Sequence, residues 1–168
     1  AADFDEQAAF LAAQIGSSIG GTSGGANLGC LTKDLQVCLD LFFDMLQNPG
    51  FDADRLALAK SQSIKQMQRR NDATRSIEGR EFGRLMRGSE HFSTSPRTRT
   101  TVEAITRDDM LAFHRRYYHP GNFIFAVSGD VDTETMLSEL ERRLDSWTVV
   151  SDPVPSVPTP EFTPEPGL

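Results

Sequence analysis

Residues 48–72 read NPGFDADRLALAKSQSIKQMQRRND, and this stretch decides how the fold is organised. Its opening, Asn48-Pro49-Gly50, is a helix breaker. Asp52 and Asp54 then supply a cap and first-turn acid, where negative charge meets the positive end of the helix dipole. The run that follows contains neither proline nor glycine, so the stretch predicts a long capped helix.

One side of this predicted helix is apolar. Leu56, Ile64 and Met67 fall on the same side at the helical repeat, so this stripe can face a core. Ala59 and Gln66 flank the stripe and lie seven residues apart, which is close to two full turns. These two flanking positions decide whether the helix offers any chemistry.

The sequence around this helix predicts an α+β domain. Its order is helix, two strands, three or four helices, strand, helix and linker. Apart from the stretch quoted above, apolar residues at helical spacing predict helices over 4–15, 32–48, 74–87, 106–118 and 133–146. A polar loop is predicted over 89–101.

Two regions predict strands. Residues 15–31 (IGSSIGGTSGGANLGCL) hold six glycines and predict two weak strands joined near Ser23-Gly24-Gly25. A phosphate-binding loop is the alternative, but the Gly-Lys-Ser/Thr ending and the strand-to-helix setting are missing. Residues 122–129 (NFIFAVSG) give the strongest strand signal, apolar enough for a central strand. Three strands are few for this much helix, so we expect the domain to be incomplete at its N-terminal end.

The helix predicted over 106–118 has its own start signal. Thr106 is the cap and Asp109 stands three residues later, a weaker form of the capping box. Met110, Phe113 and Tyr117 are predicted to point inward. From Trp147 the chain carries six prolines, so we assign 1–147 to one domain and 148–168 to a Pro-rich inter-domain linker.

Charge is unevenly distributed along the chain. The net charge is −7, but residues 60–99 hold ten basic against four acidic side chains, which leaves −13 elsewhere. This basic segment indicates either a groove for acidic partners or a solvated helix face. Phe82 and Phe92 are its only aromatic residues, which argues against nucleic-acid binding. No apolar run is long enough to span a membrane, and no signal peptide opens the chain, so no compartment is assigned.

Few residues could carry chemistry. Cys30 and Cys38 are compatible with two buried thiols or with a bridge, and both alternatives stay open. His114 and His119 are five residues apart, which is not the spacing that brings two imidazoles to one metal. His91 stands in a polar loop. The residues by themselves predict no catalytic group and no cofactor.

Two longer stretches carry a family resemblance. LDLFFDMLQNPGFDADRL (39–56) and ITRDDMLAFHRRYYHPGNFIFAVSGDVDTETMLSELERRL (105–144) resemble the insulinase/pitrilysin (M16) metallopeptidases, including mitochondrial processing peptidase subunits. The resemblance implies homologous α+β domains, with a mostly antiparallel sheet and several helices, that enclose a peptide in a clamshell. In active members, zinc is bound by an HxxEH motif and by a glutamate from a later helix. The present chain would be the later part of one such domain.

The resemblance also implies what this chain lacks. No HxxEH is present, Gln66 stands at the family's third zinc-ligand position, and Ala59 stands where the family has a second glutamate. A neutral amide is a poor zinc ligand beside carboxylate, imidazole or thiolate. We therefore expect a non-catalytic domain, inactive by itself and without zinc of its own, that pairs with a second M16 domain or subunit carrying zinc.

Three functional alternatives remain from the resemblance. The first is the non-catalytic domain, which would help to hold a peptide or unfolded protein. In active relatives a strand pairs with the substrate backbone, and Gly20 and Gly21 fall at its pairing positions. The second is part of an active zinc metalloendopeptidase whose HxxEH motif lies upstream. The third is a purely structural interaction module.

Overall fold

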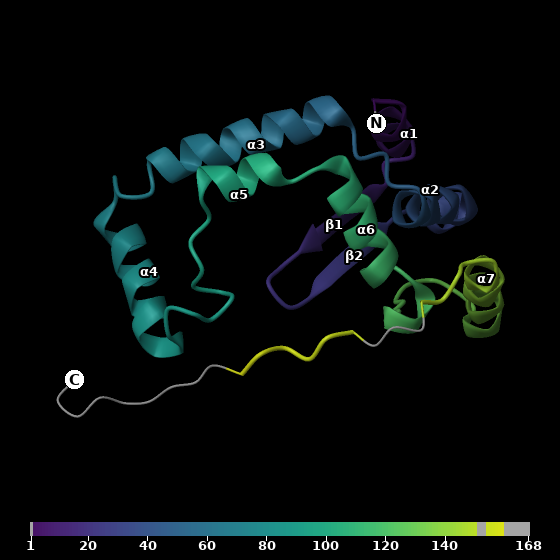
Figure 1. The fold of residues 1–168 in the computed structure, drawn as a ribbon. Helices are drawn as coiled ribbons and strands as arrows, with labels where there is room; N and C mark the ends of the chain where they lie inside the picture. Colours follow the sequence, from purple (N-terminus) through teal and green to yellow (C-terminus); the bar gives the residue numbers. More distant parts are fainter. Residues whose placement is uncertain (1, 151–153, 160–168) are drawn as a thin grey trace. The chain divides into compact units, whose positions relative to one another are not determined.

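The computed structural model describes residues 2–150 and 154–159 (Figure 1). Its elements, in chain order, are α1 (Ala2–Phe10), β1 (Gln14–Ile19), β2 (Gly24–Gly29), the 3-10 turn η1 (Thr32–Asp34), α2 (Leu35–Gln47), α3 (Ala53–Gln68), α4 (Thr74–Arg87), α5 (Arg99–Ala104), α6 (Arg107–Tyr117), the 3-10 turn η2 (Pro120–Asn122) and α7 (Thr133–Asp145). The α+β class predicted from the sequence is confirmed.

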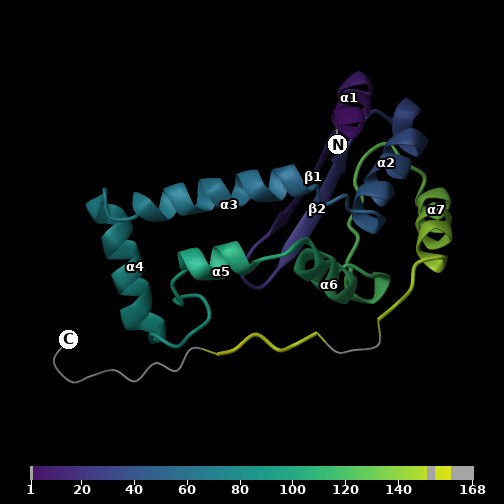
Figure 2. The same cartoon turned by 45° about the horizontal axis from the view of Figure 1, so that its top comes forward.

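The chain forms two compact units. Of the described residues, one unit contains 2–50, 110–150 and 154, and the other contains 51–109 and 155–159. The first unit contains β1 and β2, an antiparallel pair in register from Gln14↔Gly29 to Ile19↔Gly24 (Figure 2). The predicted pair of Gly-rich strands is therefore confirmed.

Helix α2 supplies the core of the first unit. Leu39, Phe42, Phe43 and Leu46 are buried and recur at helical spacing, so one face of α2 is covered along its length. Half-buried apolar side chains pack against this face. They come from the two strands, from residues 118–125, and from α7 and the residues just after it: Ile15, Leu28, Tyr118, Phe125, Leu140, Leu144 and Trp147.

Two predictions in this unit are corrected. The first helix ends at Phe10, because Ala12 takes a positive φ of 49°, and Ile15 belongs to β1 opposite Leu28. In α6, the inward residue is His114, 9% exposed, whereas the predicted inward residue Phe113 is 43% exposed. A histidine tip that finds a hydrogen-bond partner can be buried as readily as an apolar ring.

The predicted central strand over 122–129 is wrong as a paired strand. Phe123 has an extended backbone, but among the described residues the sheet contains only β1 and β2. A strand signal reports side-chain alternation and β-propensity, whereas a ladder also needs a neighbouring strand. The segment therefore keeps an alternating pattern without main-chain pairing.

The second unit contains α3, α4 and α5. Its described residues bury a single apolar side chain, Val102 of α5, while Leu56, Ile64 and Met67 of α3 are half-buried. Helices α3 and α5 lie side by side (Figures 1 and 2). The Nζ atom of Lys60 donates to the Glu103 carbonyl at 2.9 Å, which ties α3 to the end of α5.

Helix α5 was not predicted, because its sequence RTTVEA lies at the end of the predicted polar loop. Its start depends on a local capping box. The Thr98 hydroxyl accepts from the Thr101 amide at 3.1 Å, and the Thr98 amide donates to the Thr101 hydroxyl at 3.0 Å. The other helices predicted beyond α3 are confirmed, with α4 ending at Gly88.

Candidate functional site

Helix α3 carries Ala59 and Gln66, the two positions at which the family resemblance implies glutamates. Its N-cap is Asp52, whose Oδ1 accepts from the backbone amides of Asp54 and Arg55, each at 3.0 Å. This satisfies two of the four amides that a helix start leaves without an intrahelical partner. The predicted cap is confirmed, and it fixes the register of the following turns.

Ala59 and Gln66 are both exposed on α3. They lie two turns apart, so they share one side of the helix. This side presents a methyl group and a neutral amide. No group of three or more His, Cys, Asp or Glu that could hold a metal occurs in the described part of the chain. The donor set on α3 therefore does not fit zinc.

Gly20 and Gly21 lie in the turn between β1 and β2 rather than in a strand. The Gly20 amide donates to the Ser23 carbonyl at 2.7 Å, which closes this turn. The prediction that they lie within a pairing strand is wrong, because the Gly20 amide forms the hydrogen bond that closes the turn. The role of Gly20 and Gly21 in peptide binding stays a prediction. Strand β1, which precedes them, has β2 as its one strand neighbour in the described residues.

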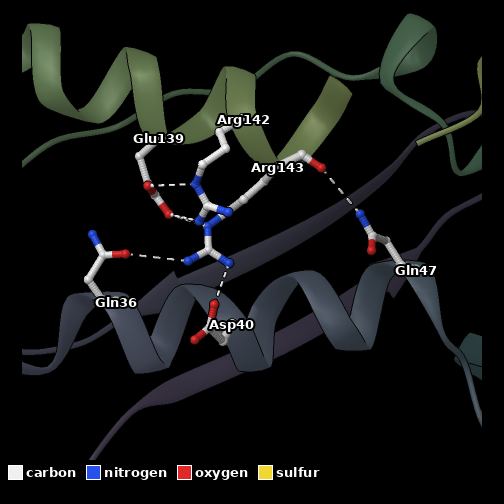
Figure 3. Close-up of polar contacts among 6 residues, drawn as sticks. All are labelled: Gln36, Asp40, Gln47, Glu139, Arg142 and Arg143. Atoms are coloured by element: carbon white, nitrogen blue, oxygen red, sulfur yellow. Dashed lines mark hydrogen bonds and ion pairs between the residues drawn. The ribbon is translucent and has the colours of Figure 1, made fainter. Parts of the chain in front are cut away.

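A polar cluster joins α2 to α7 (Figure 3). The Arg143 guanidinium, 9% exposed, contacts Asp40 Oδ1 of α2 at 2.6 Å and Glu139 Oε1 of its own helix at 2.7 Å. It also lies 5.6 Å from the centroid of the Phe43 ring. Gln47 Nε2 donates to the Arg143 carbonyl at 3.5 Å. These contacts fasten α7 to the core helix.

Within this cluster the carboxylate of Glu139 is held ionised. The Arg142 guanidinium donates to it at 2.6 Å and lowers the pKa of Glu139, and Arg143 lowers that pKa further. Sequence reasoning missed this cluster. Glu139 and Arg143 stand four residues apart on one helix face, which indicates an ion pair, but the contact with Asp40 depends on tertiary packing.

The three histidines do not come together as a metal site. His114 Nε2 lies 2.7 Å from the Leu46 carbonyl oxygen, and a carbonyl can only accept, so this nitrogen carries the proton. His119 is 4% exposed, and neither of its ring nitrogens has a hydrogen-bond partner in the described part of the chain. His91 contacts the Ser93 hydroxyl at 2.8 Å in a separate loop.

Both cysteines are free thiols. Cys38 is fully buried in α2, and Cys30 is half-buried after β2. Burial raises the pKa of Cys38 to about 11, and the neighbouring Cys30 thiol adds to this effect. The sequence left open a disulfide bridge or two separate thiols, and the structure has two separate thiols.

Parts of the chain are similar to known proteins. Residues 104–167 match the family model described as the peptidase M16 inactive domain. An uncharacterized zinc protease of Mycobacterium leprae is 28% identical over 118 residues, which are 69% of this chain and 26% of that protein. An uncharacterized zinc protease of Rickettsia bellii is 24% identical over 124 residues, 70% of this chain and 29% of that protein.

The fold has a solved counterpart. A protease from Helicobacter pylori superposes with a TM-score of 0.71 at 17% identity, and the match covers 95% of this chain and 38% of that protein. The chain thus spans between a quarter and two fifths of the proteins to which it is similar. No helix of the described residues is long and apolar enough to cross a membrane.

Proposed function

We propose that this chain is part of an M16-family protein and forms a non-catalytic part of a peptide-enclosing chamber whose zinc is bound by a second M16 domain or subunit. The observation that supports this most directly is on α3, where Ala59 and Gln66 offer no carboxylate to a metal. The match of residues 104–167 to an M16 domain described as inactive agrees with this role.

In this proposal the chain contributes binding surface rather than chemistry. The β1–β2 pair can receive an extended peptide along the outer edge of β1, because main-chain amides and carbonyls there have no strand neighbour among the described residues. Gly16 lies in β1, and Gly20 and Gly21 lie in the turn that follows it, so this strand has few bulky side chains. The substrate would be an extended peptide or an unfolded protein segment.

Metal analysis tests the division of labour. The chain is purified together with a zinc-bearing M16 subunit, the two are separated under native conditions, and zinc is measured in each by mass spectrometry. We expect zinc to remain with the partner. Stoichiometric zinc in the separated chain would contradict the proposal, because the chain would then bind the zinc that we assign to its partner.

Peptide binding tests the second half of the proposal. Fluorescence anisotropy of a labelled, extended, uncharged peptide is measured against the assembled protein. We expect saturable binding that weakens when Gly20 is replaced by alanine, since the added Cβ would lie 3.3 Å from the Ser23 carbonyl and stiffen the turn beside β1. A purely structural module would show no saturable binding of the peptide.

A second candidate function follows from the names of the relatives. Both curated relatives are called zinc proteases, and the chain spans only about a quarter of each. The chain would then be part of an active zinc metalloendopeptidase, with HxxEH outside residues 1–168 and with another acid as third ligand. An HxxEH motif in the sequence preceding this region, together with zinc in that same polypeptide, would favour this alternative.

A further inference from the structure

Cys30 and Cys38 are the two cysteines of the chain, and the fold brings their side chains together. Leu28 of β2 packs against the core face of α2, and side chains two residues apart on an extended chain point to the same side. The chain is still extended just beyond β2, because Leu31 has φ −76° and ψ 143°. Cys30 therefore faces α2 as Leu28 does, while Leu31 is 56% exposed.

Helix α2 presents Cys38 at this place. Cys38 is the fourth residue of the helix and precedes Phe42 by about one turn, so both lie on its buried face. Burial, and then the adjacent side chain of Cys30, raise the pKa of Cys38, which places the two thiols beside each other. Cys38 is fully buried, whereas Cys30 is half-buried. Solvent can reach one thiol of the pair, and the other is shielded.

This arrangement suits thiol–disulfide exchange. The exchange needs one thiol that a small disulfide can reach and a second thiol that can attack the first. We propose that Cys30 and Cys38 form a reversible redox site for a low-molecular-weight disulfide, with Cys30 as the attacking thiol and Cys38 as the resolving thiol. The chain as described is the reduced form of this site.

The exchange has two steps. The Cys30 sulfur loses its proton and attacks one sulfur of the small disulfide, so that a mixed disulfide forms at Cys30 and one small thiolate leaves. The Cys38 sulfur then loses its proton and attacks the Cys30 sulfur, which forms the bridge and releases a second small thiolate. The two thiolates take up the two protons. Two protein thiols are thereby oxidised, and one small disulfide is reduced to two thiols.

The bridge would fasten the end of β2 to the beginning of the core helix. Gly29, which precedes Cys30, pairs with Gln14 of β1, so the link also holds the strand pair on α2. A covalent link at this joint removes freedom from the unfolded chain, so the bridge and the fold stabilise each other. This inference goes beyond the proposed function and does not depend on it.

Oxidised glutathione is the probe, added to the whole folded chain, with the products followed by mass spectrometry. Lys33 lies between the two cysteines, so trypsin separates them and a bridge joins two tryptic peptides. We expect a transient glutathione adduct at Cys30, followed by a bridged chain that has lost two hydrogen atoms. Cys38 should acquire an adduct only when the chain is unfolded in urea.

Two alanine variants separate the two roles. Cys38→Ala should accumulate the glutathione adduct at Cys30, and Cys30→Ala should leave Cys38 unmodified in the folded chain. Circular dichroism shows whether each variant is folded. The unmodified chain supplies a test that needs no variant: in the same glutathione buffer, we expect the ratio of bridged to reduced chain to be about tenfold or more higher when folded than in urea.

Three results would overturn the inference. One is a glutathione adduct at Cys30 of the unmodified chain that does not resolve into a bridge. Another is modification of Cys38 before Cys30 in the folded chain. The third is a bridge that forms no more readily in the folded chain than in urea, because the fold would then not position the thiols. These readouts involve neither zinc nor peptide, so failure here is distinguishable from failure of the proposed function.

Discussion

His114 Nε2 donates to the Leu46 carbonyl oxygen at 2.7 Å and so joins α6 to the C-terminal turn of α2. This carbonyl lies in the last turn of α2, where carbonyls lack the intrahelical donors that the helix interior supplies. The imidazole therefore caps the core helix from a position 68 residues further along the chain. It also stacks on Tyr118, with ring centroids 4.9 Å apart.

His114 and His119 are both buried, but we expect their replacement by leucine to change the free energy of unfolding differently. His114→Leu removes the donor and leaves the Leu46 carbonyl unpaired, so we expect a loss of about 1–3 kcal/mol in the free energy of unfolding. His119→Leu removes ring nitrogens that have no partner in the described chain, so we expect no loss or a small gain.

Urea unfolding of the two variants beside the unmodified chain measures this difference. The two residues share a residue type and a buried position, so each serves as control for the other. An equal loss in both variants would mean that packing of the imidazole, rather than its hydrogen bond, determines the effect.

Arg143 predicts a second contrast, with its neighbour Arg142. Arg143→Met removes the contacts with Asp40 and Glu139, and we expect about 1–2 kcal/mol of destabilisation, moderated because Asp40 is 67% exposed. Arg142 is 64% exposed and contacts only Glu139 in Figure 3, so Arg142→Met is expected to destabilise the chain far less than Arg143→Met. Thermal unfolding at low and high salt checks both. Equal costs would show that Arg143 does not fasten α7 to α2.

The thiol of Cys38 predicts loss of stability at high pH. Its pKa is raised from 9.0 to about 11 in the folded chain, so the unfolded thiol ionises first as pH rises. Its contribution to the free energy of unfolding is therefore complete below about pH 9 and is lost between about pH 9 and pH 11. Unfolding across this window, compared with Cys38→Ala, isolates the contribution. A parallel decline in both proteins would assign the pH dependence to other groups.

Sequence reasoning captured the helices other than the short α5 because caps and apolar spacing are local. Asp52, the breaker before it and Gly88 each stop or start a helix through contacts within a few residues. It failed where the outcome depends on distant parts of the chain. The segment 123–128 has the side-chain pattern of a strand, but pairing requires a neighbour that its own sequence does not reveal.

The candidate site also combines features that the sequence predicts with features that it does not predict. The absence of carboxylates at Ala59 and Gln66 can be read from the sequence once the family resemblance is recognised, and the structure shows that both positions are exposed. The turn position of Gly20 and Gly21 could not be read, because a Gly/Ser-rich run does not fix where the strand ends. The burial of His114 depends on a carbonyl contributed by another helix.

Glutamates introduced at positions 59 and 66 test whether carboxylates on α3 would bind zinc. We expect the double variant Ala59→Glu, Gln66→Glu to fold with a change of about 0.5 kcal/mol or less, because both positions are exposed on a helix and glutamate favours that conformation. We also expect it to bind no zinc at stoichiometric level. Two carboxylates give a hard, incomplete ligand set, and the described chain has no group of three or more His, Cys, Asp or Glu that could hold a metal by itself. Equilibrium dialysis against zinc measures this, with Ala59→Gln, Gln66→Ala as the uncharged control. Tight zinc binding by the double glutamate variant alone would show that this chain retains the remaining ligands of a metal site, and the proposed division between a binding domain and a zinc-bearing partner would then be wrong.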